Sequence, residues 1–206
     1  MSAQAQRMSV HDFLAMEARD GTRCEYVDGE VFAMSGPSRR HQLIAGNLFR
    51  LTANAARNRC QLFFAGMMVR VEAHNSLYLP DVFGCCDPDD GEEQYVSSPC
   101  FIIEVLSPST AHIDRREKRI AYRTLKSLDE YVLVSQQRMH VSVYRSDSGL
   151  WASQVLESPS DVLELKCIEL RVSLADIYEG VKLPPLQVRD SDSPWWSDQE
   201  IEYALS

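Results

Sequence analysis

The sequence has no long hydrophobic run. Its longest uncharged stretches, Cys60 to Val69 and Gln94 to Ile103, are ten residues each, half of the ~20 that a membrane-spanning helix needs. The opening residues MSAQAQRMSV hold no apolar signal core. We therefore expect a cytoplasmic protein with no membrane segment. Internal repeats and low-complexity segments are also missing.

An excess of basic residues is missing too. The chain has 21 Lys and Arg against 30 Asp and Glu, a formal net charge of −9, whereas nucleic-acid-binding domains usually run basic. The charge is unevenly distributed along the chain. Residues 112–126 hold six basic and two acidic side chains, whereas residues 187–206 hold one basic and five acidic side chains. A local basic face is therefore still possible, and a bound divalent cation would offset nearby carboxylates.

Spacings typical of metal-binding cysteine and histidine are absent. The six cysteines (residues 24, 60, 85, 86, 100 and 167) include no CxxC pair, and histidines 11, 74, 112 and 140 share no zinc-like spacing. We therefore interpret the cysteines as small buried hydrophobic residues in a reducing compartment. Adjacent side chains of a strand point to opposite faces, so Cys85 and Cys86 are not expected to form a redox pair.

The sequence contains an alternation of helical and strand patterns that is typical of an α/β or α+β fold. A length of 206 residues favours a single domain, expected over residues 1–186 and followed by an acidic extension over residues 187–206. Helices are expected at 10–18, 38–59 and 173–180, and a third helix in chain order is expected to end near residue 126 and to begin either at Thr110 or at the capping pattern of Asp114 and Glu117. An N-terminal β-hairpin is expected around Asp28-Gly29. Further strands are expected at 61–72, 77–87 and 99–106, followed by strand pairs 130–137 with 138–146 and 151–157 with 161–170.

Helical and strand periodicity place the expected core. On the second helix, one face carries His41, Ile44, Leu48, Leu51 and Ala55 at spacings of 3, 4, 3 and 4, so this face should pack on a sheet. The run FIIEVL is almost entirely apolar and should be a central strand.

Two carboxylates lie where carboxylates are unusual. Asp81 follows Pro80 inside an apolar strand, and Glu104 interrupts FIIEVL. A buried unpaired carboxylate costs several kcal/mol or becomes protonated, so each needs a reason. For one such residue a structural ion pair is as good an explanation as a catalytic role. Two of them on consecutive strands favour a shared divalent cation.

Lys118 lies on the inward face of the third helix, with Asp114, Tyr122 and Leu125 at helical spacing. An ammonium beside two carboxylates can orient or deprotonate a water molecule, or neutralise charge in a transition state. The alternative is a salt bridge to Asp114 one turn earlier. Three basic side chains of this helix are expected to face solvent: Arg115, Arg116 and Arg119.

These residues resemble the PD-(D/E)xK nuclease superfamily, through Pro80-Asp81 followed by Glu104-Val105-Leu106 on the next strand. More narrowly, the chain resembles the restriction endonuclease family called Uma-two over about residues 10 to 180. The matching pieces are CEYVDGEVFAMS, His41, PDVFGCCD, FIIEVLSPST, then Asp114, Lys118, Tyr122 and EYVLV. Each short motif is weak alone, whereas the ordered set is specific.

The resemblance implies a restriction-endonuclease-like core, with a central mixed β-sheet flanked by helices, that cleaves phosphodiester bonds with Mg²⁺, for which Mn²⁺ can substitute. It implies Asp81 and Glu104 as metal ligands, with the Val105 carbonyl as a third. Mg²⁺ prefers hard oxygen ligands of this kind. The superfamily lysine two residues after the glutamate is Leu106 here, and its role is expected to have moved to Lys118.

Two further residues match family positions. Glu25 could be a second acidic ligand, and its alternative is a cross-strand pair with Arg or Lys. His41 could also belong to the site, but a lone histidine on an apolar stripe is more often structural, which is the interpretation favoured here.

Three functions compete at this stage. The first is a Mg²⁺-dependent DNA endonuclease, cutting as a homodimer if both strands are cleaved, with phosphate contacts from Arg39, Arg40, Arg115, Arg116 and Arg119. The second is a catalytically silent binding or scaffold protein on the same fold, which the net charge and Leu106 favour. The third is a metal-dependent hydrolase acting on another substrate.

Overall fold

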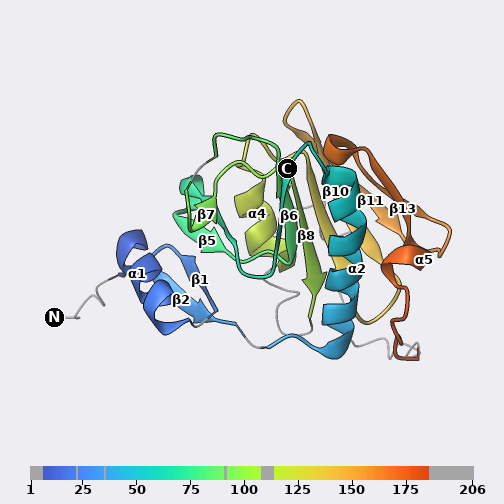
Figure 1. Ribbon diagram of the computed structural model, residues 1–206, viewed down its shortest axis with the longest axis horizontal. Coiled ribbons are helices and arrows are strands. Elements are labelled where there is room, and N and C mark those ends of the chain that lie inside the picture. The colour runs from blue at the N-terminus through green and yellow to red at the C-terminus, as the bar shows by residue number, and fades with distance from the viewer. Residues whose placement is uncertain (1–6, 22, 35, 91, 108–113, 186–206) are drawn as a thin grey trace.

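The structure is a computed structural model that describes residues 7–21, 23–34, 36–90, 92–107 and 114–185, apart from the side chains of 114 and 115 (Figure 1). Its strands form three sheets. The six-stranded sheet contains, in spatial order, β11 (Leu150–Leu156), β10 (Val141–Asp147), β9 (Glu130–Ser135), β8 (Phe101–Leu106), β6 (Val82–Cys85) and β3 (Gln61–Phe64). The five-stranded sheet contains β2 (Glu30–Ala33), β1 (Cys24–Val27), β5 (Ser76–Tyr78), β4 (Met68–Val71) and β7 (Tyr95–Val96). The two-stranded sheet contains β12 (Val162–Leu165) and β13 (Leu170–Ser173).

The helical elements are mostly short. They are α1 (Val10–Asp20), α2 (Arg39–Ala56), α4 (Arg119–Tyr122), α5 (Leu174–Ile177), the π-helical turn η2 (Asp114–Lys118) and the 3₁₀ turns η1 (Glu72–His74) and η3 (Lys166–Ile168). The strand pairs β8–β9 and β4–β7 are parallel and the other pairs are antiparallel. The expected mixed sheet flanked by helices, with an N-terminal hairpin, is therefore confirmed.

Local sequence signals explain the first elements. Asp28 and Gly29 both have positive φ, 45° and 93°, as the tight turn between β1 and β2 requires. The side chain of Ser9 accepts a hydrogen bond from the N–H of Asp12 at the start of α1. Ser38 does the same for His41 at the start of α2. These caps satisfy N–H groups that have no partner inside the helix.

The central strand β8 separates two cores. Phe101, Ile103 and Val105 pack on one side, in a cluster with Ile44 and Leu48 of α2. Figure 1 shows α2 lying across this side of the six-stranded sheet. The alternate residues of β8 point to the opposite side, where a second cluster joins the sheet to α4 and to β4 and β5. Glu104 belongs to this second face by its place in the alternation.

The buried face of α2 differs slightly from the prediction. Ile44 and Leu48 are buried, as expected, but the stripe then continues through Thr52 and Ala56. Leu51 and Ala55 are only half-buried at its edge and still pack on the core.

Two segments predicted as single strands are each divided between two sheets. Residues 61–72 form β3 and β4, separated at Ala65 and Gly66, whose φ values are 45° and 140°. Residues 77–87 form β5 and β6, separated at Pro80-Asp81. A proline has no N–H to donate to a sheet, so the chain leaves one sheet there and enters the other.

The predicted pairing of 151–157 with 161–170 is wrong. β11 instead pairs with β10, because Ser148 and Gly149 adopt positive φ and close a tight hairpin. β12 pairs with β13. The third helix is also shorter than predicted: its described part runs from η2 to the end of α4 at Tyr122, and residues 108–113 lie outside the described ones.

The prediction that all six cysteines are free is wrong for Cys60 and Cys86, which form a disulfide bond. Gln61 pairs with Cys85 across β3 and β6, so Cys60 and Cys86 occupy the next opposed positions. Cys85 points into the core, and burial raises the pKa of its thiol to about 11. The expectation that Cys85 and Cys86 do not pair is confirmed.

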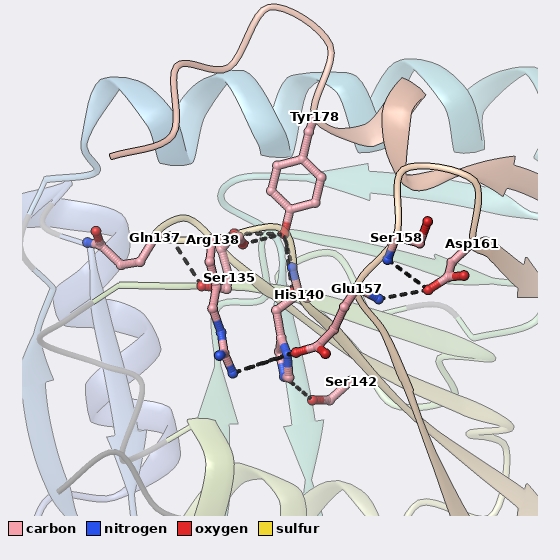
Figure 2. Close-up of polar contacts among 9 residues, drawn as sticks. All are labelled: Ser135, Gln137, Arg138, His140, Ser142, Glu157, Ser158, Asp161 and Tyr178. Carbon is pink, nitrogen blue, oxygen red and sulfur yellow. Dashed lines mark hydrogen bonds and ion pairs between the residues drawn. The ribbon is translucent and has the colours of Figure 1, made fainter. Parts of the chain in front are cut away.

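A hydrogen-bonded cluster holds the C-terminal elements onto the six-stranded sheet (Figure 2). The Tyr178 hydroxyl lies 2.8 Å from the carbonyl oxygen of Ser135, 3.1 Å from that of Arg138 and 3.2 Å from that of His140. It also accepts a hydrogen bond from the N–H of His140. The turn between β9 and β10 is thereby fixed against the end of α5.

Within the described ranges, no helix is long and apolar enough to cross a membrane. The proposed extension at 187–206 lies outside these ranges, and the division of the chain at residue 186 stays a prediction.

Candidate active site

The two carboxylates predicted from the sequence lie opposite each other. β6 and β8 are antiparallel, with Val82 paired to Ile103, so the next position places Asp81 against Glu104. Oδ2 of Asp81 accepts a hydrogen bond of 2.8 Å from the N–H of Val105. Asp81 is partly exposed, whereas Glu104 is buried. One carboxylate therefore reaches the surface and the other lies just beneath it.

Lys118 reaches the same place from η2. Its Nζ lies 3.1 Å from Oε1 of Glu104 and 2.7 Å from Oε1 of Glu25. The lysine side chain is only 3% exposed. Its partners are therefore glutamates of two different sheets, and the helical partner Asp114, weighed in the sequence analysis, has a side chain outside the described ones.

Glu25 comes from β1 and is buried. Besides binding Lys118, its Oε1 accepts a hydrogen bond of 3.0 Å from the N–H of Leu79. Its cross-strand neighbour on β2 is Phe32. Glu25 therefore does not form the cross-strand ion pair with Arg or Lys on β2 that was the alternative interpretation. The lysine partner comes from a helical turn distant in sequence.

His41 lies on the first turn of α2 and contacts the site. Its Nε2 is 3.2 Å from Oδ2 of Asp81. Nδ1 of the same ring is buried and has no hydrogen-bond partner among the described residues. The structure thus brings His41 to Asp81, and the interpretation of His41 as a structural histidine stays a prediction.

Two tyrosines surround the ammonium and Glu104. The Tyr122 hydroxyl lies 3.3 Å from Oε1 of Glu104, and burial followed by the charge of Glu104 raises the pKa of Tyr122 well above its usual value. This phenol therefore stays protonated and donates to the carboxylate. Lys118 Nζ also lies 5.6 Å from the centre of the Tyr78 ring, a cation–π distance.

Neither tyrosine was among the predicted site residues. Tyr122 was expected to face inward and belongs to the pieces that resemble the family, but it was given no role in the site. Tyr78 carried no signal beyond its position three residues before Asp81. Tyr78 and Tyr122 also contact each other edge to face, with ring centres 5.4 Å apart. Both tyrosines are buried, as is Lys118.

The site has an excess of negative charge. Glu25, Glu104 and Asp81 bring three carboxylates, against one ammonium from Lys118. With His41 counted as neutral, the described side chains of the site have a formal charge of −2. Carboxylates gathered in this way repel one another, and a divalent cation would offset their charge.

The donor set fits Mg²⁺. Oδ2 of Asp81 contacts both the N–H of Val105 and Nε2 of His41, and Glu104 lies opposite Asp81. Across the described part of the chain, these acids do not close into a cage of three adjacent protein ligands. Mg²⁺ usually takes one or two carboxylates and fills its shell with water and phosphate oxygen. Val105 contributes its N–H to Asp81, and a role for its carbonyl oxygen stays a prediction.

The predicted phosphate-binding arginines are placed differently from one another. Arg39 and Arg116 are exposed, and Arg40 is half-buried. Arg119 was expected to face solvent, which is wrong: it is half-buried, with its guanidinium carbon 5.3 Å from the centre of the Tyr144 ring. Tyr144 on β10 lies within reach of α4 and offers a stacking surface. The side chain of Arg115 lies outside the described ones.

A protein-family model matches most of the chain. The model of the Uma2 family, described as "Putative restriction endonuclease", matches residues 10–175. Two Synechocystis proteins are similar to this chain. "Uncharacterized protein slr1290" is 33% identical over 87% of this chain and 96% of its own length. "Uncharacterized protein sll1609" is 29% identical over 67% of this chain and 80% of its own length.

A solved structure shares the fold. It is described as "a putative nuclease belonging to DUF820 from Anabaena variabilis", and it superposes with a TM-score of 0.63 at 16% identity over 77% of this chain and 90% of that one. The fold is therefore restriction-endonuclease-like, and the match over residues 10–175 shows that this chain belongs to the Uma2 family.

Proposed function

We propose that this chain is a Mg²⁺-dependent DNA endonuclease that hydrolyses phosphodiester bonds at the site of Asp81, Glu104 and Lys118. The observation that carries the proposal is the buried ammonium of Lys118, held 3.1 Å from Glu104 where Glu104 faces Asp81. The family description and the nuclease description of the similar solved structure support it. Asp81, Glu104 and the Val105 carbonyl are the proposed metal ligands.

Mg²⁺ bound there would polarise the scissile phosphate, lower the pKa of a water molecule and stabilise the leaving oxygen. Lys118 is proposed to orient that water or to neutralise charge on the phosphate, in place of the lysine that Leu106 replaces. Glu25 positions Lys118 through their contact of 2.7 Å. His41 positions Asp81 in the same way.

Phosphate contacts beyond the metal are assigned to the exposed arginines Arg39 and Arg116. Cleavage of both strands of a duplex would require two sites, and we propose that a homodimer supplies them. Light scattering of the protein alone and with a short duplex measures this stoichiometry.

A catalytically silent DNA-binding or scaffold protein is the second candidate. Leu106 favours it, because a leucine at this position can neither bind a proton nor carry charge. Fold membership does not decide between the two, since one fold hosts many functions.

The test is cleavage of supercoiled plasmid and of single-stranded DNA with Mg²⁺ or Mn²⁺. Wild type is expected to cut, and Asp81→Ala and Lys118→Ala to lose cutting. Lys126→Ala, an exposed lysine on the same segment, is the matched control and should cut like wild type. If Lys118→Ala still cuts DNA, the protein is a nuclease but Lys118 does not have the proposed catalytic role. No cutting by folded, metal-binding wild type on either substrate would favour the scaffold.

A further inference from the structure

Four cysteines converge at the end of the sheet opposite to the candidate active site. Cys60 immediately precedes β3, Cys86 follows β6, Cys100 precedes β8 and Cys167 lies in η3. Asp81 and Glu104 lie near the other ends of β6 and β8. β6 alone spans four residues, about 13 Å at ~3.3 Å per residue. The cysteine cluster is therefore separate from the acidic site.

The sulfur atoms are close enough for one small ion. Sγ of Cys60, Cys86 and Cys100 all lie within 4.8 Å of one another, and in the described part of the chain this is the sole group of three such ligands. Cys86 Sγ is 3.0 Å from Cys100 Sγ. Cys167 Sγ is not within 4.8 Å of all three of these sulfurs, but its thiol interacts with that of Cys100, which makes it the nearest candidate for a fourth ligand.

This geometry suits zinc. Zinc bound by four thiolates has Zn–S bonds of about 2.3 Å in a tetrahedron, which places the sulfurs about 3.8 Å apart. Cys100 is buried, 7% exposed, so a metal here would be shielded from water.

We propose that Cys60, Cys86, Cys100 and Cys167 are the ligands of a Zn²⁺ site that forms when the Cys60–Cys86 disulfide is reduced. A dithiol reductant supplies the two electrons: the bond between the two sulfurs breaks, two thiols form, and the reductant becomes its own disulfide. Zn²⁺ then displaces the thiol protons as the four Zn–S bonds form. The disulfide joins β3 to β6 alone, whereas the metal also fixes the start of β8 and η3.

The test uses the full-length protein, reduced with a phosphine and titrated without oxygen. Co²⁺ serves as the spectroscopic probe, and Zn²⁺ is then added to displace it. One equivalent of Co²⁺ is expected to give the absorption of a tetrahedral thiolate complex, and one equivalent of Zn²⁺ to remove it. Native mass spectrometry is expected to show one bound zinc.

The variants locate the site. Cys100→Ser and Cys167→Ser are expected to lose the Co²⁺ absorption. Cys24→Ser, which changes a buried free cysteine in another core, should keep it, as should Asp81→Asn in the acidic site. Circular dichroism checks that each variant is folded, and the half-buried Cys167 offers a second position if Cys100→Ser does not fold.

Two results would overturn the proposal. One is a reduced wild type that binds neither metal with thiolate absorption. The other is equal binding by Cys24→Ser, Cys100→Ser and Cys167→Ser. Peptide mapping that finds exchange to a Cys86–Cys100 disulfide, with no metal bound after reduction, would point to thiol chemistry in place of a zinc site. Retention of zinc by Asp81→Asn keeps this test independent of the proposed nuclease.

Discussion

Lys118 Nζ lies 2.7 Å from Oε1 of Glu25, and this contact joins η2 to β1 of the five-stranded sheet. Because Lys118 also binds Glu104 on β8, the same ammonium links the two large sheets. The two glutamates are 79 positions apart in the sequence. A single buried cation therefore holds the acidic site together and contributes to the packing of the sheets.

Removal of this cation should be strongly destabilising. Lys118→Met removes the ammonium that contacts the buried Glu25 and Glu104, and breaking a buried ion pair in this way costs about 3–5 kcal/mol. We expect urea unfolding to show a loss of that size in the free energy of unfolding. Lys126→Met, at an exposed position, should change it by less than ~0.5 kcal/mol. Equal stability of the two variants would contradict the role given to Lys118.

His41 should act on metal binding through Asp81. Loss of a residue that orients a metal ligand typically lowers affinity by about 10- to 100-fold. We expect His41→Ala to weaken Mn²⁺ binding by this factor, measured from the paramagnetic resonance of free Mn²⁺. His11→Ala, at an exposed histidine of α1, is the control. Unchanged affinity in His41→Ala would show that the contact with Asp81 does not position the ligand.

Much of the site could be predicted because chemistry marks it locally. Asp81 and Glu104 stand out as acids inside apolar strands, and helical spacing turns Lys118 inward. Nothing local connects these residues to Glu25 or His41. Their meeting depends on how a hairpin, a long helix and two sheets pack, and periodicity does not report such packing. Only the resemblance to the family indicated from the sequence that Glu25 and His41 belong with Asp81, Glu104 and Lys118.

The errors in the fold have a similar cause. Alternation predicts extended chain at 61–72 and 77–87 but does not show that the chain changes sheet at Ala65-Gly66 and at Pro80-Asp81. The Cys60–Cys86 disulfide follows from the register of β3 and β6, which cysteine spacing does not encode. The hairpin at Asp28-Gly29 was predictable because two adjacent residues specify its turn.

Tyr178 should contribute to stability through its hydroxyl. Tyr178→Phe leaves the N–H of His140 without its acceptor and three carbonyl oxygens without this donor (Figure 2). A buried group deprived of its partner costs about 1–3 kcal/mol, so thermal unfolding should shift to lower temperature. Tyr95→Phe, on a half-buried strand, is the control. Identical melting of the two variants would exclude the hydroxyl as a stabilising contact.

Stability should fall at alkaline pH. Burial raises the pKa of Tyr78 and of Tyr178 to about 12, above the value of about 10 in an unfolded chain. As the pH rises from 10 to 12, the unfolded state loses these protons while the folded state keeps them. The stabilisation is therefore complete below pH 10 and is lost toward pH 12.

Urea unfolding between pH 8 and pH 12 measures this loss. The midpoint concentration of urea is expected to decline above pH 10, and Tyr78→Phe and Tyr178→Phe should each make the decline less steep. A midpoint that stays constant up to pH 12 in wild type would contradict the protonated, buried state of these phenols.

The most direct test of the acidic site is thermal unfolding as a function of Mg²⁺ concentration. Wild type should be stabilised by RT ln(1 + [Mg²⁺]/Kd), about 2.7 kcal/mol at 100 times Kd. Asp81→Asn and Glu104→Gln should lose this gain. Without metal they should be as stable as wild type or more so, because each removes one of three neighbouring negative charges among the described side chains of the site. Variants that collapse without metal, or that keep the full gain with it, would show that these carboxylates serve structural ion pairs and do not bind a cation.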